Sequence, residues 1–541
     1  MSWQDQVAKK RSEVLARIPV EWTEIIDSVV ATADPSSNVL ALILNQLLTP
    51  EQLEITLKNA SQLIPAMQSG ELSSEKVVTA FAKKTAAVAK LTNAVSEPLY
   101  SEAINRAREL DTLPKDEKLK LPLFGLPITV KDSFNVPGVQ STLGTVSRIA
   151  LPPASKASPA VALLTDRLGA IVIAKTNVPQ AIITPESHNN VFGRTLNPAN
   201  PKEWGSGGSS GGEGVLVSQR ASALGLGTDL AGSIRVPAWS NGAYGYKPSL
   251  KIVPYLGFED AGKPPREPGL TATVGPLAQS ADDLELFLKS VIGARPWEDP
   301  ELENSLEPIE WKEDHHLPET FTVGILTGSP GVPITSQVQE TVRLTAEKLG
   351  AAGHKLVWID EAAAPSISDL TQQVGVPLIS LDTDGTHLEA IRRGGEPLTP
   401  ETARGHTGLF EPHIEKNEQD GSEQVFVAKV IPFTVSDEDL AKSKTLQGEF
   451  IKAWDDLFTA HKLDALMCPL IDEFAPAHGK FDLTPFAINW NTVDYPAISI
   501  PVNRQSLGYN NLVKPQAVQL VAQNLEDQRL LAVAKALEKV L

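Results

Sequence analysis

The chain has 541 residues, of which 42% are hydrophobic and 21% are charged, so it can build a sizeable core and does not have the composition of a disordered protein. Lysine and arginine together number 48 and aspartate and glutamate 66, which gives a formal net charge of −18. This acidic balance argues against nucleic acid or an anionic membrane surface as the main partner, because both attract clustered positive charge.

The N-terminal residues and the cysteine content indicate a reducing compartment. Cys468 is the only cysteine, so no disulfide can form within the chain, and its apolar context predicts a small buried side chain rather than a nucleophile. The polar N-terminus leads into Lys9-Lys10-Arg11 without an apolar run and does not match a signal peptide. The apolar stretch 39–48 is shorter than the roughly 20 residues that span a bilayer. We therefore expect a cytoplasmic protein without a membrane span.

Helical patterns dominate residues 1–110, with Ser73 and Ser74 suited to cap a helix over 75–90. Beyond residue 120, strands are predicted at 127–130 and 171–174, with a helix over 158–168 between them. Further predicted elements, in chain order, are a helix opened by Ser280, a strand–helix–strand unit over 321–359, strands at 465–467 and 497–501, and a helix over 527–540. Alternating strands and helices predict an α/β fold with a mainly parallel sheet.

No flexible linker interrupts this alternation, so we expect a single domain over residues 1–541. Within it we expect an N-terminal helical segment (1–70), a core (120–300) and an excursion of short helices and loops (362–440). The acidic, proline-rich stretch 297–318 is interpreted as a surface connection.

Nine of the ten residues from Gly205 to Gly214 are glycine or serine. A flexible linker is one interpretation, but an apolar segment at 215–217, expected to be a strand, follows at once. A phosphate-binding loop is another, although the lysine of the P-loop motif is missing. The GxSxG pattern of a nucleophile elbow occurs around Ser209 and around Ser210, but no apolar strand precedes it.

Small residues lead to Ser233, and Ile-Arg-Val-Pro-Ala follows it. This pattern predicts a tight turn that feeds a helix, and such a turn leaves successive backbone N–H groups available to an oxyanion. Asp229 and Arg235 flank the turn with opposite charges, and we interpret them as a structural ion pair that holds it.

A serine nucleophile needs a base, and none of the nine histidines lies in a recognisable catalytic or metal-ligating string. Lys131 is the candidate, because it ends an apolar strand, where a lysine is costly unless it is paired or neutral. Its ordinary pKa of about 10.4 leaves only about one lysine in a few thousand neutral at pH 7, so desolvation would have to lower that pKa. A rival Ser-x-x-Lys pair, Ser73 and Lys76, is interpreted as a helix cap.

Five segments in order resemble the motifs of the amidase signature family: 125–132, 175–180, 192–198, 207–214 and 227–235. The resemblance covers roughly residues 70–300 and resumes from about 464, and residues 9–22 resemble fungal acetamidase-type enzymes. It implies the amidase signature fold, an α/β fold with a large mixed, mostly parallel β-sheet covered by helices on both faces.

The resemblance also implies a Ser-cisSer-Lys triad that works through an acyl-enzyme. Ser233 would attack the amide carbonyl, and Ser209, following a cis peptide bond, would pass the proton to Lys131. Ile182 would contact the substrate, and Ser210 would support the loop. Four successive backbone N–H groups would form the oxyanion hole: those of Leu230, Ala231, Gly232 and Ser233. The chemistry requires no metal and no organic cofactor.

The expected reaction converts small aliphatic or aryl amides to carboxylate and ammonia or amine. An esterase or carbamate (urethane) hydrolase could use the same triad, and a non-catalytic scaffold could keep the same fold. A tRNA-linked amidotransferase subunit is disfavoured by the acidic charge. The expected partner is a small amide substrate, with neither nucleic acid nor membrane, and a homodimer is the default assembly.

Overall fold

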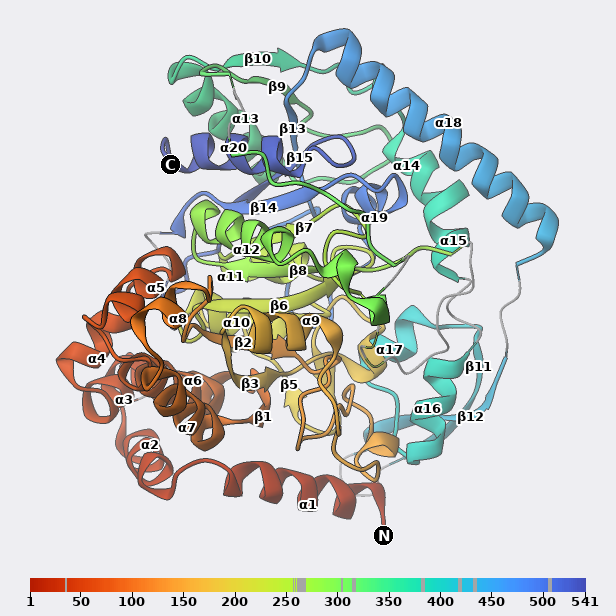
Figure 1. The fold of residues 1–541 in the computed structure, drawn as a ribbon. Coiled ribbons are helices and arrows are strands. Elements are labelled where there is room, and N and C mark those ends of the chain that lie inside the picture. The colour runs from red at the N-terminus through yellow and green to blue at the C-terminus, as the bar shows by residue number, and fades with distance from the viewer. Residues whose placement is uncertain are drawn as a thin grey trace.

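The computed structural model describes the chain except for residues 35–36, 256, 258, 260–268, 303–304, 314–317, 381–384, 417–420, 432–434 and 505–507. Its main strands are β1 (Val95–Pro98), β2 (Pro127–Lys131), β3 (Ile171–Thr176), β6 (Leu224–Asp229), β7 (Tyr244–Lys247), β8 (Thr273–Ala278), β9 (Thr322–Ile325), β10 (Lys355–Trp358), β13 (Ala465–Cys468), β14 (Ala497–Pro501) and β15 (Ala517–Val521). They form one 11-stranded sheet through the centre of the molecule, in the order β1-β3-β2-β6-β8-β7-β14-β15-β13-β9-β10 (Figure 1).

The sheet is mixed, as expected, and its parallel pairs lie towards its two ends. Strands β3, β2 and β6 pair in parallel, and so do β13, β9 and β10. The other six neighbouring pairs between the described strands are antiparallel, which leaves four of the ten pairs parallel. Some antiparallel neighbours, such as β14 and β15, follow one another directly in the chain, whereas parallel neighbours require a crossover connection.

The N-terminal part of the chain is a helical layer, coloured red to orange in Figure 1. Its helices are α1 (Trp3–Ala16), α2 (Val20–Thr32), α3 (Val39–Leu47), α4 (Pro50–Ile55), α5 (Ala60–Ser69), α6 (Ser74–Thr92), α7 (Tyr100–Asp111) and α8 (Lys115–Leu119). The Ser73 hydroxyl accepts a hydrogen bond from the Lys76 backbone N–H at 3.2 Å, which confirms the cap of α6. A wholly helical segment over 1–110 is wrong at β1, because this strand pairs with the edge of β3.

Helices cover both faces of the sheet, as expected. They include α9 (Pro159–Ala162), α10 (Gly211–Ser218), α11 (Arg235–Asn241), α12 (Ala281–Gly293), α13 (Ser336–Ala351), α18 (Asp437–His461), α19 (Pro485–Thr492) and α20 (Asp527–Glu538). Ile128 and Val130 of β2 pack in one core with apolar residues of α7, α12 and α20. The alternation along β2 places Thr129 and Lys131 on the opposite face, towards α10.

The expected strand at 215–217 is wrong, because these residues lie in α10. The glycines of the preceding segment let this helix approach its neighbours closely. A Cβ atom at Gly212 would lie 2.4 Å from the carbonyl oxygen of Ala94. The Gly/Ser segment is therefore a tightly packed loop and helix start rather than a linker.

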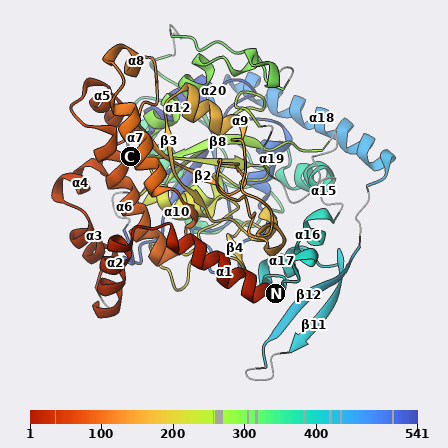
Figure 2. The same cartoon turned by 60° about the horizontal axis from the view of Figure 1, so that its bottom comes forward.

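The excursion over 362–440 contains more than the expected short helices. Its described elements are α14 (Ile367–Leu370), α15 (Val376–Ser380), α16 (Thr386–Gly394), α17 (Pro400–Gly405), β11 (Phe410–Lys416) and β12 (Glu423–Val430). Strands β11 and β12 form a hairpin that projects from the rest of the molecule in Figure 2. Two shorter strands pair nearby, β4 (His188–Asn189) with β5 (Gly193–Arg194). No described helix has the length and apolar content needed to cross a membrane.

Candidate active site

Lys131 ends β2 with its side chain fully buried. Its Nζ donates to Ser209 Oγ at 2.7 Å and to Thr228 Oγ1, on the adjacent strand β6, also at 2.7 Å. The peptide bond between Gly208 and Ser209 is cis. Residues 78 positions apart in sequence thus meet as a buried amine and a hydroxyl. The sequence analysis missed Thr228, although it lies in the same motif as Ser233.

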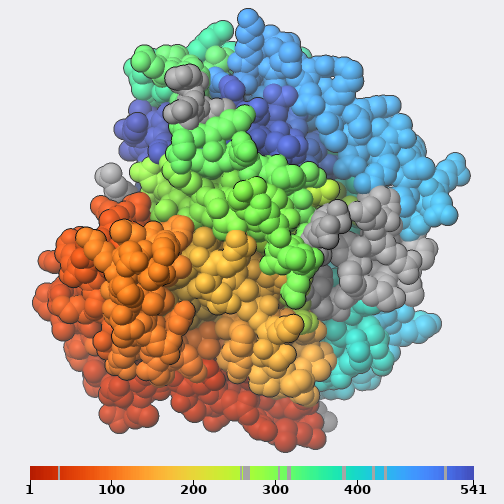
Figure 3. Space-filling view, viewed as in Figure 1, coloured from red at the N-terminus to blue at the C-terminus, as the bar shows by residue number. Residues whose placement is uncertain are grey.

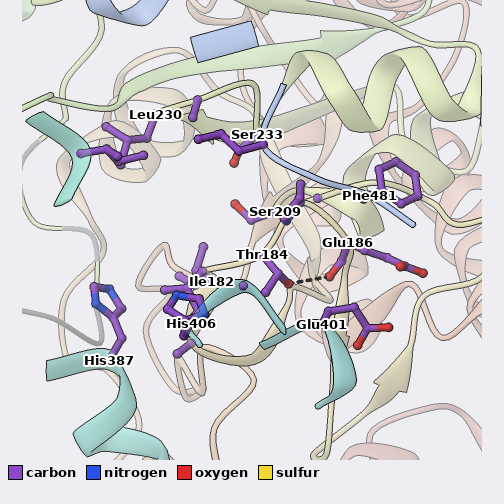
Figure 4. Close-up of a pocket in the computed structure, with 18 of the residues that line it drawn as sticks. Ile182, Thr184, Glu186, Ser209, Leu230, Ser233, His387, Glu401, His406 and Phe481 are labelled. Atoms are coloured by element: carbon purple, nitrogen blue, oxygen red, sulfur yellow. Dashed lines mark hydrogen bonds between the residues drawn. The ribbon is translucent and has the colours of Figure 1, made fainter. Parts of the chain in front are cut away.

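Ser233 lies in the turn between β6 and α11, half-buried at the edge of a cavity. Its carbonyl oxygen accepts a hydrogen bond from the Ser210 backbone N–H at 3.1 Å, which ties the turn to the loop that carries Ser209. In Figure 4, the side chains of Ser209 and Ser233 face the same part of this cavity. The structure therefore brings all three residues of the expected triad together.

Asp229 and Arg235 form the expected ion pair, fully buried, across this turn. Arg235 donates to Asp229 through Nη2 and Nε, both at 2.9 Å. The same carboxylate accepts from the backbone N–H of Gly232 at 2.8 Å and of Ile234 at 3.2 Å. Burial alone would raise the pKa of Asp229, but Arg235 and these hydrogen bonds outweigh it and hold that pKa well below its usual range. The pair fixes the backbone of the turn.

One of the four expected oxyanion donors is already engaged. The Gly232 N–H points at Asp229, so it is not available to a substrate. Within the described part of the chain, no backbone acceptor is bonded to the N–H groups of Leu230, Ala231 and Ser233. Gly232 is still required as glycine, because its φ is +110° and a Cβ atom there would lie 2.8 Å from Ala487 Cβ.

The cavity beside the serines has a volume of about 400 Å³. Its apolar lining comes from segments that are far apart in sequence, with Ile182, Leu230, Val376, Ile379, Leu409 and Phe481 among its residues. Polar groups of the excursion also line the cavity, including His387, Glu401 and His406 (Figure 4). The sequence indicated the wall around Ile182, but not the wall that the excursion supplies.

Trp239, Phe486 and Trp490 are buried in the core and do not line the cavity. Trp239 stacks on Phe474 at 5.1 Å between ring centroids, and Trp490 packs edge-on against Trp454 at 5.0 Å. Phe486 is buried with Trp490. From the region 440–495, the cavity takes Phe481, Asp482 and Leu483.

Ile182 follows Ala181 in a turn where both residues have left-handed backbone angles, with φ of 66° and 54°. A positive φ at a β-branched residue is rare and marks a strained position, as found at functional sites. The cavity wall beyond them is anchored by Arg194, which donates to Glu401 on α17 at 2.6 Å and pairs with buried Glu186. The excursion is thereby held against the turn.

Two further residues can be placed. Ser210 is fully buried, and its Oγ has no hydrogen-bond partner among the described residues. Cys468 is also buried, and burial raises the pKa of its thiol to about 12, which confirms it as an inert core residue. In the part of the chain that the structure describes, no cluster of three or more His, Cys, Asp or Glu side chains is arranged to hold a metal ion.

Replacing Asp229 by Asn should destabilise the protein by about 3–5 kcal/mol at pH 7, because it leaves the Arg235 guanidinium buried without its counter-charge. The native pKa of Asp229 is depressed, so its contribution is complete above the unfolded pKa of about 3.9 and is lost as the pH falls below it. Urea unfolding at pH 7 and pH 3 should show a smaller gap between variant and wild type in acid, because part of this contribution is already lost at pH 3.

The matched control is Asp456→Asn, which breaks the exposed Lys452–Asp456 pair on α18 and should change stability little. An Asp229→Asn protein as stable as this control at pH 7 would contradict the structural role of the buried pair.

Comparisons with known proteins agree with this fold. A family model described as Amidase matches residues 76–531. A protein named Amidase from Gibberella moniliformis is 32% identical, over 100% of this chain and 99% of its own length. An Acetamidase from Aspergillus oryzae is 29% identical, over 100% of this chain and 99% of its own length.

A solved structure titled Fatty acid amide hydrolase superposes with a TM-score of 0.84 at 27% identity, covering 99% of this chain and 95% of that one. The fold is thus that of the amidase signature enzymes. The chain belongs to the amidase family and is a hydrolase that acts on amides.

Proposed function

We propose that this hydrolase cleaves carboxamide C–N bonds through an acyl-enzyme on Ser233, with Ser209 as proton relay and Lys131 as base. The observation that carries the proposal is the 2.7 Å hydrogen bond from buried Lys131 Nζ to Ser209 Oγ, beside Ser233 at the same cavity. Burial disfavours the charged ammonium form of a lysine and so favours the neutral amine. The neutral amine is the form that can act as a base at this position.

In the proposed reaction, Ser233 Oγ attacks the amide carbonyl carbon while its proton passes to Ser209 and the proton of Ser209 passes to Lys131 Nζ. The N–H groups of Leu230, Ala231 and Ser233 stabilise the tetrahedral oxyanion. The C–N bond then breaks, and the proton returns through Ser209 to the leaving nitrogen. Water then attacks the resulting ester and gives a proton to the same relay, which returns it to Ser233 Oγ as the ester bond breaks. The acid product loses its remaining proton to solvent and leaves as the carboxylate.

The cavity supports a substrate larger than acetamide. Its volume of about 400 Å³ lies in the range of pockets that hold drug-sized ligands, and apolar side chains surround the serines. We therefore propose uncharged amides with an apolar aliphatic or aryl acyl group as substrates. The strands of one sheet span residues 95–521, which supports our proposal of a single amidase domain.

The proposal predicts ammonia or amine release from a panel of acetamide, hexanamide, benzamide, an anilide and ethyl carbamate. Hexanamide and benzamide should exceed acetamide in kcat/KM by at least about tenfold, because each buried methylene contributes roughly 1–3 kcal/mol. A fluorophosphonate probe should label Ser233, as seen by peptide mass spectrometry.

The outcomes separate the alternatives. Fastest turnover of ethyl carbamate would favour the carbamate hydrolase. Labelling of Ser233 without turnover of any amide would contradict the proposed substrate class. An unlabelled Ser233 in folded protein would contradict the nucleophile and support the scaffold.

A further inference from the structure

Helix α1 lies along the lower surface of the molecule in Figures 1 and 3 and precedes the residues matched by the family model. One lysine of this helix nevertheless points into the protein. Lys10 is only 4% exposed, whereas the side chain of the preceding Lys9 is 68% exposed. Lys10 Nζ forms a buried ion pair with Glu97 on β1 and donates to Gln140 Oε1 at 2.8 Å.

A second buried ion pair lies next to the first. Lys175 Nζ is 3.6 Å from Asp132 Oδ1, and both side chains are fully buried. Lys175 also donates to the carbonyl oxygen of Gln140 at 2.7 Å, so Gln140 joins the two ammonium groups. Lys175 is also the register partner of Glu97 between β3 and β1. Burial raises the pKa of the Glu97 carboxyl, which the Lys10 ammonium counteracts.

Two hydrogen bonds, one from a backbone N–H to the Asp132 side chain and one between backbone groups, connect these two ion pairs to the candidate active site. Asp132 follows Lys131 directly, and its Oδ2 accepts from the Leu143 N–H at 2.7 Å. The Leu143 carbonyl oxygen accepts from the Ala181 N–H at 2.9 Å, and Ala181 precedes Ile182 in the cavity wall.

Leu143, Ala181 and Ile182 all have left-handed backbone angles, with φ between 52° and 66°. Each such conformation costs about 1–3 kcal/mol in a non-glycine residue, so it persists only where neighbouring groups hold it. The hydrogen bonds from Asp132 to Leu143 and from Leu143 to Ala181 provide that hold.

We propose that Lys10 is a positioning residue for the active site. Its ammonium neutralises Glu97 and fixes Gln140, and this keeps the Lys175–Asp132 pair and the Leu143–Ala181 hydrogen bond in place. This inference rests on the roles of Lys131 and Ser233 proposed above. Without Lys10, Glu97 is left buried without its counter-charge and competes with Asp132 for Lys175.

A purely structural role for Lys10 would be to dock α1. Other attachments serve that purpose: Arg11 in the helix donates to the Val191 carbonyl at 2.6 Å, and Arg17, directly after the helix, donates to the Pro98 carbonyl at 2.9 Å. Val7 also packs against Val146. Docking of α1 therefore does not depend on Lys10 alone.

The test uses full-length Lys10→Met, Glu97→Gln and the double variant, with Lys9→Met as the matched control on the exposed side of α1. Activity is expressed per fluorophosphonate-titrated site, so unfolded protein does not enter kcat. Lys10→Met should lose roughly ten- to a hundredfold in kcat, since small displacements of catalytic groups have effects of this size. The double variant, which removes both buried charges, should recover most of the loss, and Lys9→Met should match wild type.

Wild-type kcat per titrated site in Lys10→Met, with only a lower Tm, would overturn the proposal and leave a structural role. A double variant no better than the single ones would also overturn it. If Lys10→Met does not fold, Gln140→Met tests the same connection, because it removes the side-chain hydrogen bond between Gln140 and Lys10. An unchanged kcat in Gln140→Met would contradict the inference. Failure of the proposed function would be visible separately, as absent labelling and turnover in wild type.

Discussion

Ser233→Ala should lower turnover of the best amide by a factor on the order of 10⁴ to 10⁶ while the protein remains folded. The reason is that Ser233 provides the only oxygen proposed to bond to the carbonyl carbon, whereas the oxyanion donors and the cavity wall stay in place. The measurement is ammonia release under saturating amide, with circular dichroism and thermal unfolding as tests of the fold.

Ser240→Ala is the matched control for this variant. Ser240 is a buried serine in α11, the helix that follows Ser233, and its Oγ has no hydrogen-bond partner within the described residues. Its removal should leave kcat close to the wild-type value. Residual activity of more than a few per cent in Ser233→Ala, with the control active, would mean that another group forms the acyl-enzyme.

Lys131→Ala should reduce kcat by about a thousandfold or more, because Ser209 loses the group proposed to take its proton. Lys131→Arg distinguishes a base from a mere positive charge. An arginine keeps the charge but cannot be deprotonated in a protein, so it should be as inactive as the alanine variant.

The pH dependence of kcat/KM gives a second readout of Lys131. If its neutral amine is the base, wild-type activity rises with pH as the ammonium loses its proton, and this acidic limb should disappear from the residual activity of Lys131→Ala. A substantially active Lys131→Arg enzyme, or an unchanged pH profile in Lys131→Ala, would contradict the role of Lys131 as base.

The sequence predicted the parts of the site that depend on local chain geometry. The small residues before Ser233 specify a tight turn whatever packs around it, and the charges of Asp229 and Arg235 lie close enough in sequence to meet across that turn. Lys131 at the end of an apolar strand is an unfavourable placement that is visible without any tertiary information. These features led to the expected serine and lysine residues.

Predictions failed where packing outweighs local pattern. The apolar residues 215–217 suit a strand by composition, yet glycines on one side let them form a helix pressed against the backbone at Ala94. The antiparallel centre of the sheet also pairs strands that are far apart in the chain, such as β7 and β14, which strand propensity alone does not reveal.

By itself the sequence determined which residues are proposed to react, because a nucleophile motif and an isolated lysine are properties of short segments. Only the tertiary structure decided what surrounds them. The cavity takes walls from residues near 182, 230, 379 and 481, and Lys10 reaches the interior next to Glu97, 87 positions away. Such contacts depend on how whole elements pack, and burial, which decides whether a charge must be paired, exists only after folding.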